Sequence, residues 1–227
     1  MFGQPKSRGG LEPDALIFAD RRDAGRRLAL AVAEAPPLDP VVVALPRGGV
    51  PVGAEVARGL SAPLDVLSVR KLGAPGRPEL AVGAIAEGDE ARPVFNRVLI
   101  QELGVDSDEL DREIARQTDR LHRLDDAIRE GRPPIPRRGK DVVLVDDGLA
   151  TGATARAAIQ RLRRDGVRSI TLAVPVAPAD TLADLRSWVD RIVCPLRPAD
   201  FEAVGRYYRN FDPVSEIQVR ALLRNES

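Results

Sequence analysis

Residues 142–154 read VVLVDDGLATGAT, and this stretch decides the fold class. Residues 142–145 are all apolar, which is typical of a strand covered on both faces, as in a parallel sheet. Asp146 and Asp147 end the strand, and a loop of small residues leads into a helical pattern from Ala153. Ligands of open α/β sheets bind where such strands end. The stretch therefore predicts both the sheet and the place of its binding site.

The rest of the chain repeats this alternation of strands and helices. Similar apolar runs predict further strands at 41–45, 170–176 and 192–194. The spacing of apolar residues, with a capping Asp20, an early Pro51 and a terminating Gly166, predicts helices. These predicted helices cover residues 20–32, 51–60, 153–165 and 181–188. The predicted fold class is therefore α/β, with a doubly wound, mainly parallel sheet.

Residues 72–138 interrupt that alternation. Gly and Pro at 73–78 predict a flexible loop, and 82–86 with 94–98 predict a hairpin. A long helix follows, because Asp106 and Glu109 form a capping box. Its apolar stripe is Leu110, Ile114, Leu121, Leu124 and Ile128, and Gly and Pro at 131–136 end it. Two interpretations stay open: an insertion packed on the edge of a single domain spanning 1–227, or a dimerisation helix within 99–130 that has no catalytic part.

Composition excludes several classes of function. The chain has 34 basic and 34 acidic residues, so we expect no nucleic-acid partner bound through bulk charge. Cys194 is the single cysteine, which excludes an internal disulfide, and its apolar neighbours predict a small buried side chain. Residues 1–10 lack the apolar core of a signal peptide, and no apolar run is long enough to span a bilayer. We expect a cytoplasmic protein without a membrane partner.

The loop after residue 145 has the chemistry of a sugar-phosphate site. Small residues allow close approach of a phosphate, and the N–H groups of 150–154 at a helix start favour an anion. Thr151 and Thr154 add hydroxyl donors. Asp146 and Asp147 suit sugar hydroxyls, which donate to carboxylate oxygens, and they can help to hold a divalent metal. The alternative is a plain turn in which the threonines only cap the helix.

The whole run resembles the phosphoribosyl-pyrophosphate (PRPP) signature of the type I phosphoribosyltransferases: an apolar strand, two acids, two variable residues, then Ala150 and a Thr-Gly-x-Thr loop. A second strand and turn, VALPRGGVP at 43–51, resembles the pyrophosphate loop of that family, in which a peptide bond is often cis. The Gly/Pro-rich segment after Lys71 occupies the place of the family's flexible catalytic loop. Lys71 and Arg77 are its candidates to reach pyrophosphate.

The resemblance implies transfer of ribose 5-phosphate from PRPP to a nitrogenous base or similar acceptor, with release of pyrophosphate. It implies catalytic roles for Asp146, Asp147 and Lys71. Mg²⁺ would bridge pyrophosphate and ribose, and the two aspartates would hold it indirectly, through ribose hydroxyls or water. The substrate-binding residues it implies are Arg47, Gly48, Gly49, Ala150, Thr151, Gly152, Ala153 and Thr154.

Two features bear on the acceptor. The Arg-Gly-Gly form at 47–49 resembles xanthine–guanine enzymes, whereas Ala150 stands where hypoxanthine–guanine enzymes have an aspartate. The two conflict, so the acceptor stays open. Residues 196–227 resemble the variable hood of the family followed by a helix from Asp212, and a ring such as Tyr207 is a candidate to stack on a flat base. The alternative for these aromatics is packing of the hood against the sheet.

Competing functions also stay open. A non-catalytic regulator that senses PRPP or a nucleotide would have the same fold and the same acids. A PRPP synthetase needs a longer, duplicated chain, and the turn at 47–49 lacks the third glycine of a nicotinamide-binding fingerprint. As an enzyme, the protein is expected to form a homodimer.

Overall fold

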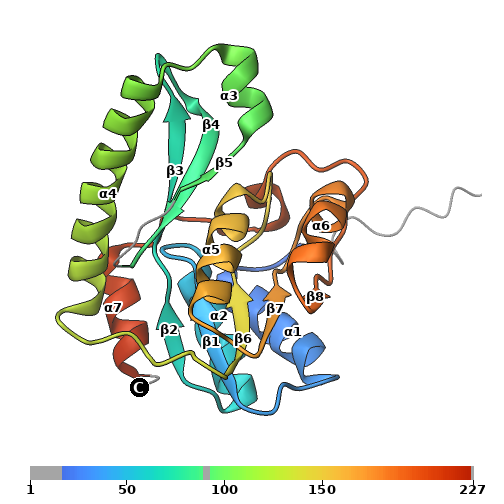
Figure 1. Ribbon diagram of the computed structural model, residues 1–227. Helices are drawn as coiled ribbons and strands as arrows, with labels where there is room; N and C mark the ends of the chain where they lie inside the picture. Colours follow the sequence, from blue (N-terminus) through green and yellow to red (C-terminus); the bar gives the residue numbers. More distant parts are fainter. Residues whose placement is uncertain (1–16, 89–92, 226–227) are drawn as a thin grey trace, which may run out of the picture.

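The computed structural model describes residues 17–88 and 93–225, so the N-terminal segment 1–10 lies outside the described residues. A parallel sheet forms its centre (Figure 1), as the sequence predicts, and it has a fifth strand, at 64–66, that the sequence analysis did not predict. The strands in sheet order are β2 (Leu64–Val66), β1 (Pro40–Ala44), β6 (Asp141–Val145), β7 (Ser169–Ala173) and β8 (Arg191–Val193).

Both faces of this sheet are covered, which explains the unbroken apolar runs. Alternate residues of β1 and β6 enter different cores. Val42 and Val143, which are neighbours in register, face the core beneath α1 (Arg21–Ala33) and α2 (Gly49–Leu60). Val43 and Leu144 face the opposite core, with residues of α5 (Ala153–Arg164) and α6 (Ala179–Leu185).

The helix boundaries follow local capping. Asp20 accepts from the N–H of Asp23 at 2.8 Å and begins α1, as predicted. α2 begins at Gly49, two residues before Pro51. α5 ends one residue before the predicted Asp165, and α6 continues into a short 3-10 turn, Arg186–Trp188. The last helix, α7 (Glu216–Asn225), begins after the predicted Asp212 because Ser215 caps it, accepting from the N–H of Gln218.

The predicted flexible loop at 73–78 is instead the tight end of a hairpin. β3 (Val69–Ala74) and β4 (Arg77–Ala86) pair antiparallel, with Ala74 opposite Arg77. Gly76 has a φ of 70°, which explains a Gly/Pro-rich turn without a long loop. The hairpin predicted from 82–86 and 94–98 is present as well, because Ala84 of β4 pairs with Val94 of β5 (Val94–Phe95). β5 ends at Phe95 rather than at residue 98, since Asn96 caps a short helix, α3 (Arg97–Leu103).

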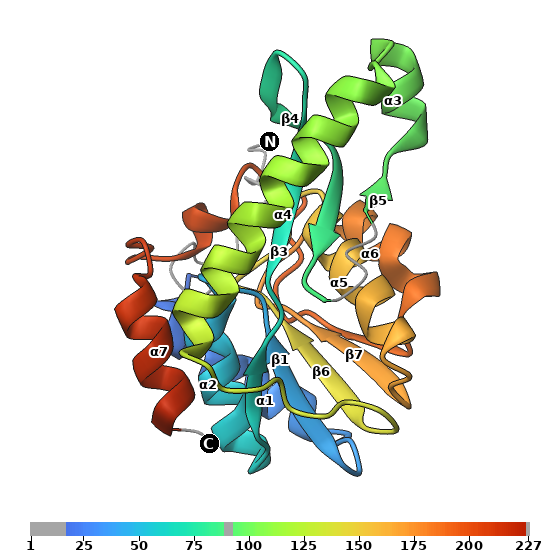
Figure 2. The same ribbon diagram turned by 60° about the vertical axis from the view of Figure 1, so that its left-hand side comes forward.

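The long helix α4 (Ser107–Arg129) stands beside this hairpin (Figure 2). Asp106 caps it by accepting from the N–H groups of Asp108 and Glu109. The predicted apolar stripe divides between two partners. Leu110 and Ile114 pack on the hairpin core, whereas Ile128 lies in the core beneath α1 and α2. Within the described residues, no helix is both long and apolar enough to cross a bilayer.

Candidate phosphate-binding site

Two loops meet at the C-terminal edge of the sheet, one after β1 and one after β6. These strands are neighbours, and the N–H of Leu45 donates to the carbonyl of Val145 at 2.9 Å. The loops lie so close that a Cβ on Gly48 would be 2.1 Å from Oδ2 of Asp147. A Cβ on Gly49 would be 2.9 Å from the carbonyl oxygen of Val145. Glycine is therefore required at both positions.

The loop after β1 leads directly into α2. The peptide bond between Pro46 and Arg47 is cis, the geometry that the family resemblance implies is frequent here. The Arg47 side chain is exposed, while Gly48 is half-buried. No side chain caps α2 at Gly48, so the helix start next to the two aspartates offers backbone N–H groups rather than a polar side chain.

The loop after β6 ends in a second helix start without a side-chain cap. Gly152 is the N-cap of α5, with a φ of 70°, and no side chain hydrogen-bonds to the cap. Thr151 is exposed and Thr154 half-buried. Thr151 and Thr154 therefore do not cap α5 in the described structure, and the binding role of the loop stays a prediction. The first-turn N–H groups of α5 stay available to an anion, and the helix dipole favours it.

Contacts with α6 and with the segment after β7 fix the position of the loop after β6. Thr181, in the first turn of α6, donates its hydroxyl to the carbonyl of Ala150 at 2.6 Å. The N–H of Leu149 donates to the carbonyl of Val176 at 3.0 Å. A Cβ on Gly152 would lie 3.1 Å from Thr181 and Leu185 side-chain atoms, so α6 packs tightly on the loop. The loop is thus preorganised before any ligand arrives.

Asp146 and Asp147 lie half-buried between the two loops. Burial, and next the charge of Asp147, raise the pKa of Asp146 well above its usual range. Burial also raises the pKa of Asp147, and Arg21 opposes that rise. The N–H of Asp147 donates to Oδ1 of Asp146 at 2.9 Å. Raised pKa values of adjacent carboxyls are typical of functional sites.

Arg21 is a site residue that the sequence reasoning missed. Its Nε donates to Oδ2 of Asp147 at 2.8 Å, and both side chains are largely buried. Its guanidinium lies 3.8 Å from the ring centroid of Phe211 and donates to the carbonyl of Asp212 at 2.8 Å. Arg21 therefore joins the first turn of α1, the aspartate pair and the C-terminal segment. No local signal marks it, because its partners are 126 and 191 residues away.

The aromatic residue that reaches the site is Tyr208. Its hydroxyl donates to the backbone carbonyl of Asp147 at 2.5 Å. The predicted stacking candidate, Tyr207, packs on Phe201 with ring centroids 5.7 Å apart, and its hydroxyl donates to the carbonyl of Asp200. Tyr207 thus belongs to the aromatic packing of the C-terminal segment.

Lys71 comes to the same side of the molecule as the phosphate loop. A cavity of about 410 Å³ opens between the hairpin and the start of α5, and Lys71 lines it together with Thr151 and Ala153. Phe95 and Trp188 line it as well. Arg77, at the far turn of the hairpin, is not among its lining residues. Of the two basic candidates, the structure brings only Lys71 near the loop.

The donor set suits a magnesium ion held partly by substrate. No group of three or more His, Cys, Asp or Glu side chains that would hold a metal occurs within the described part of the chain. Asp146 and Asp147 are the acids at the loops. One or two carboxylates, with water and phosphate oxygens completing the shell, is how proteins usually bind Mg²⁺. The residues therefore fit an ion that arrives with a phosphorylated substrate.

This parallel sheet, with two uncapped helix starts around a pair of acids, is the arrangement of the type I phosphoribosyltransferase fold. The family model of the phosphoribosyl transferase domain matches residues 20–211. The chain therefore belongs to the phosphoribosyltransferase family, and the resemblance predicted from 142–154 and 43–51 is confirmed.

Similar proteins agree with this family assignment. Two proteins of Mycobacterium tuberculosis, from strains CDC 1551 / Oshkosh and ATCC 25618 / H37Rv, are 47% identical over 207 residues, and their names assign them provisionally to the phosphoribosyl transferases. The match covers 91% of this chain and 46% of each relative, so the chain spans about half their length. The crystal structure of TT1426 from Thermus thermophilus matches with a TM-score of 0.80 and 44% identity, over 93% of this chain and 99% of that one.

Proposed function

We propose that the protein transfers ribose 5-phosphate from PRPP to a nitrogenous base or similar acceptor and releases pyrophosphate. One observation supports this most. The uncapped start of α5 lies directly after two carboxylates, so one short loop offers both a phosphate cradle and acceptors for ribose hydroxyls. The facing loop, residues 47–49, lies within contact of the same carboxylates and suits pyrophosphate.

In the proposed reaction, a nitrogen of the acceptor attacks C1 of the ribose, and the bond from C1 to the pyrophosphate oxygen breaks. Pyrophosphate leaves with the electron pair, while the ribose gains oxocarbenium character. Asp146 and Asp147 hold the ribose hydroxyls and stabilise that positive charge, and Lys71 reaches toward the phosphates. Bound Mg²⁺ would offset the negative charge that develops on pyrophosphate. Catalysis then rests on positioning and electrostatics rather than on a covalent intermediate.

We propose the acceptor only as a chemical class, a nitrogenous base or similar molecule. Ala150 provides no acid–base side chain, and its carbonyl is bound by Thr181. We also propose that the protein is cytoplasmic and assembles as a homodimer.

A second candidate is a regulator that binds PRPP or a nucleotide without turnover. The observation in its favour is the 2.8 Å ion pair between Arg21 and Asp147, which occupies one oxygen of a carboxylate that the transferase would use.

In the deciding experiment, the protein is incubated with PRPP, Mg²⁺ and one acceptor at a time from a panel of purines, pyrimidines and nicotinate-like bases. Both the PRPP affinity and the amount of released pyrophosphate are measured. Acceptor-dependent release supports the transferase. Binding without release for any acceptor supports the regulator. If PRPP does not bind, the transferase and the PRPP-sensing regulator both fail, whereas a regulator that senses a nucleotide is tested by titration with a nucleotide. The variant Asp147→Asn should weaken PRPP binding, and Asp39→Asn is its matched control, because Asp39 is an exposed acid paired with Lys140 away from the loops.

A further inference from the structure

A second cavity lies away from the two loops. Its volume is about 970 Å³, and it opens between α4, the segment 134–138 and the C-terminal half of α5. No residue of the loops at 46–49 or 146–154 lines it. Along α5, the first residue that lines the cavity is Arg161, about 12 Å of helix after Ala153. The cavity is therefore distinct from the proposed PRPP site.

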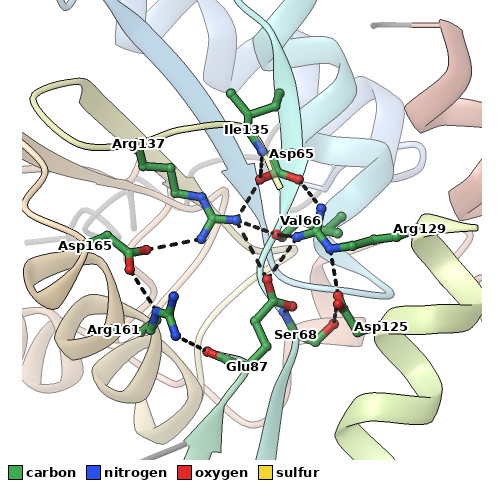
Figure 3. Close-up of polar contacts among 10 residues, drawn as sticks. All are labelled: Asp65, Val66, Ser68, Glu87, Asp125, Arg129, Ile135, Arg137, Arg161 and Asp165. Atoms are coloured by element: carbon green, nitrogen blue, oxygen red, sulfur yellow. Dashed lines mark hydrogen bonds and ion pairs between the residues drawn. The ribbon is translucent and has the colours of Figure 1, made fainter. Parts of the chain in front are cut away.

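The acids of this cavity are already engaged, as Figure 3 shows for the network beside it. Asp165 pairs with Nε of Arg161 at 2.9 Å and with Arg137 at 3.4 Å. Glu87 and Asp125 each pair with Arg129 at 2.9 Å. Carboxylates that are held in ion pairs leave little negative charge to meet a further cation.

The arginines of the same cavity are in excess over these acids. Arg138 and Arg164 are exposed and line the cavity, and neither has a carboxylate partner within residues 17–88 and 93–225. Arg137 is more deeply placed: its side chain is 4% exposed, its guanidinium pairs with Asp65 at 2.6 Å, and its buried Nε has no hydrogen-bond partner in the described structure. Among the described residues, the cavity thus presents two guanidinium groups, those of Arg138 and Arg164, that no ion pair balances.

We propose that this cavity binds an oligophosphate, either a free polyphosphate or the phosphate chain of a nucleotide. Guanidinium groups bind phosphate oxygens through two parallel hydrogen bonds, and Arg138 and Arg164 are free to do so. The volume is large enough for a nucleotide. Pro134, Ile135 and Pro136 form an apolar wall against which a base packs.

The site also touches the hairpin. Arg161 lines the cavity and donates to the carbonyl of Glu87 at 2.8 Å, where β4 ends. A Cβ on the next residue, Gly88, would lie 1.2 Å from the same guanidinium. The cavity is therefore built from four parts of the chain: the end of the hairpin, α4, the segment 134–138 and α5. This proposal does not rest on the proposed function, because no residue of the PRPP loops takes part.

The test is calorimetric titration of the full chain with tripolyphosphate and, separately, with ATP, both without Mg²⁺. The double variant Arg138→Ala/Arg164→Ala is expected to weaken binding of the tripolyphosphate by about tenfold or more. The control is Arg163→Ala/Arg186→Ala, which removes the same charge from exposed arginines outside the cavity and should leave the affinity unchanged. Tighter binding of ATP than of tripolyphosphate identifies a nucleotide as the ligand, and equal binding identifies the free anion.

The location of the tripolyphosphate site is checked independently by modification of arginines with phenylglyoxal, followed by mass spectrometry. Tripolyphosphate should protect Arg138 and Arg164 and leave Arg163 and Arg186 reactive. No tripolyphosphate binding to the unmodified chain, or binding that the cavity double variant leaves unchanged, overturns the proposal. If these arginines serve only the C-terminus of α5, the double variant lowers stability while the affinity and the protection pattern show no cavity site, which also overturns it.

Discussion

Nε of Arg21 lies 2.8 Å from Oδ2 of Asp147, so the first turn of α1 is joined to the end of β6 across 126 residues. The same guanidinium lies on the ring of Phe211. Because Oδ2 accepts from Arg21, the other carboxylate oxygen is left for a ligand. Arg21 thus opposes the effect of burial on the pKa of Asp147 and holds Oδ2 in an ion pair.

Replacing Arg21 tests that role. Burial raises the pKa of Asp147 and Arg21 opposes it, so Arg21→Met should raise that pKa further. A neutral Asp147 accepts ribose hydroxyls poorly, so PRPP affinity at pH 7 should fall about tenfold, the equivalent of about 1.4 kcal/mol. The pH at which affinity is half-maximal should move upward, as calorimetry across pH 5 to 9 would show. Arg27→Met, which removes an exposed arginine from the same helix, is the control. An unmoved midpoint would mean that Arg21 is only structural.

Gly48→Ala tests the contact between the two loops. A Cβ there would be 2.1 Å from Oδ2 of Asp147, so the carboxylate must move and its ion pair with Arg21 must break. We expect PRPP affinity to fall by about tenfold or more. The control is Gly139→Ala, where φ is 72° but nothing lies within 4 Å, so only stability should fall, by about 1 kcal/mol. Equal affinities in the two variants would contradict the contact.

Asp146→Asn is expected to stabilise the fold and weaken function. Burial, reinforced by Asp147, raises the pKa of Asp146 in the folded chain, so the folded state binds its proton more tightly than the unfolded state. Stability is therefore lost as pH rises above 3.8, the usual value, toward the folded pKa. At pH 8, urea denaturation should show a gain of about 1 kcal/mol for the variant, with a smaller gain at pH 4. A gain that does not grow with pH would show that ionisation of Asp146 is not the cause. Loss of PRPP binding should accompany the gain.

Glu87 should make stability depend on pH near neutrality. Burial, and then a hydrogen bond with Asp125, raise its pKa from 4.5 to about 7. The unfolded chain ionises first, so the free energy of unfolding falls between about pH 4.5 and 7 and levels off above. The loss is on the order of 3 kcal/mol. Glu87→Gln should flatten this slope in denaturation curves at pH 5 and 8. Glu34→Gln, an exposed acid just after α1, should keep it; a slope that survives Glu87→Gln assigns the effect to other groups.

Local chemistry in the sequence determined the central sheet and the two loops. Apolar runs such as 142–145 form strands that must be buried on both faces of a sheet. A strand of this kind that is followed by acids and small residues is compatible with few folds other than an open α/β sheet. The same logic was wrong for 73–78. Gly and Pro specify a turn, but whether they make a long loop or a tight hairpin depends on the pairing of β3 with β4.

Only the tertiary structure decided which distant groups complete the site. Arg21 and Tyr208 bind Asp147, and Phe211 packs on Arg21, because α1 and the C-terminal segment pack together over the sheet edge. The arginines around the second cavity likewise converge from α5 and the segment 134–138. A residue's type and spacing reveal its local role, but an ion pair between residues 126 positions apart depends on how the whole chain packs, which no local pattern encodes.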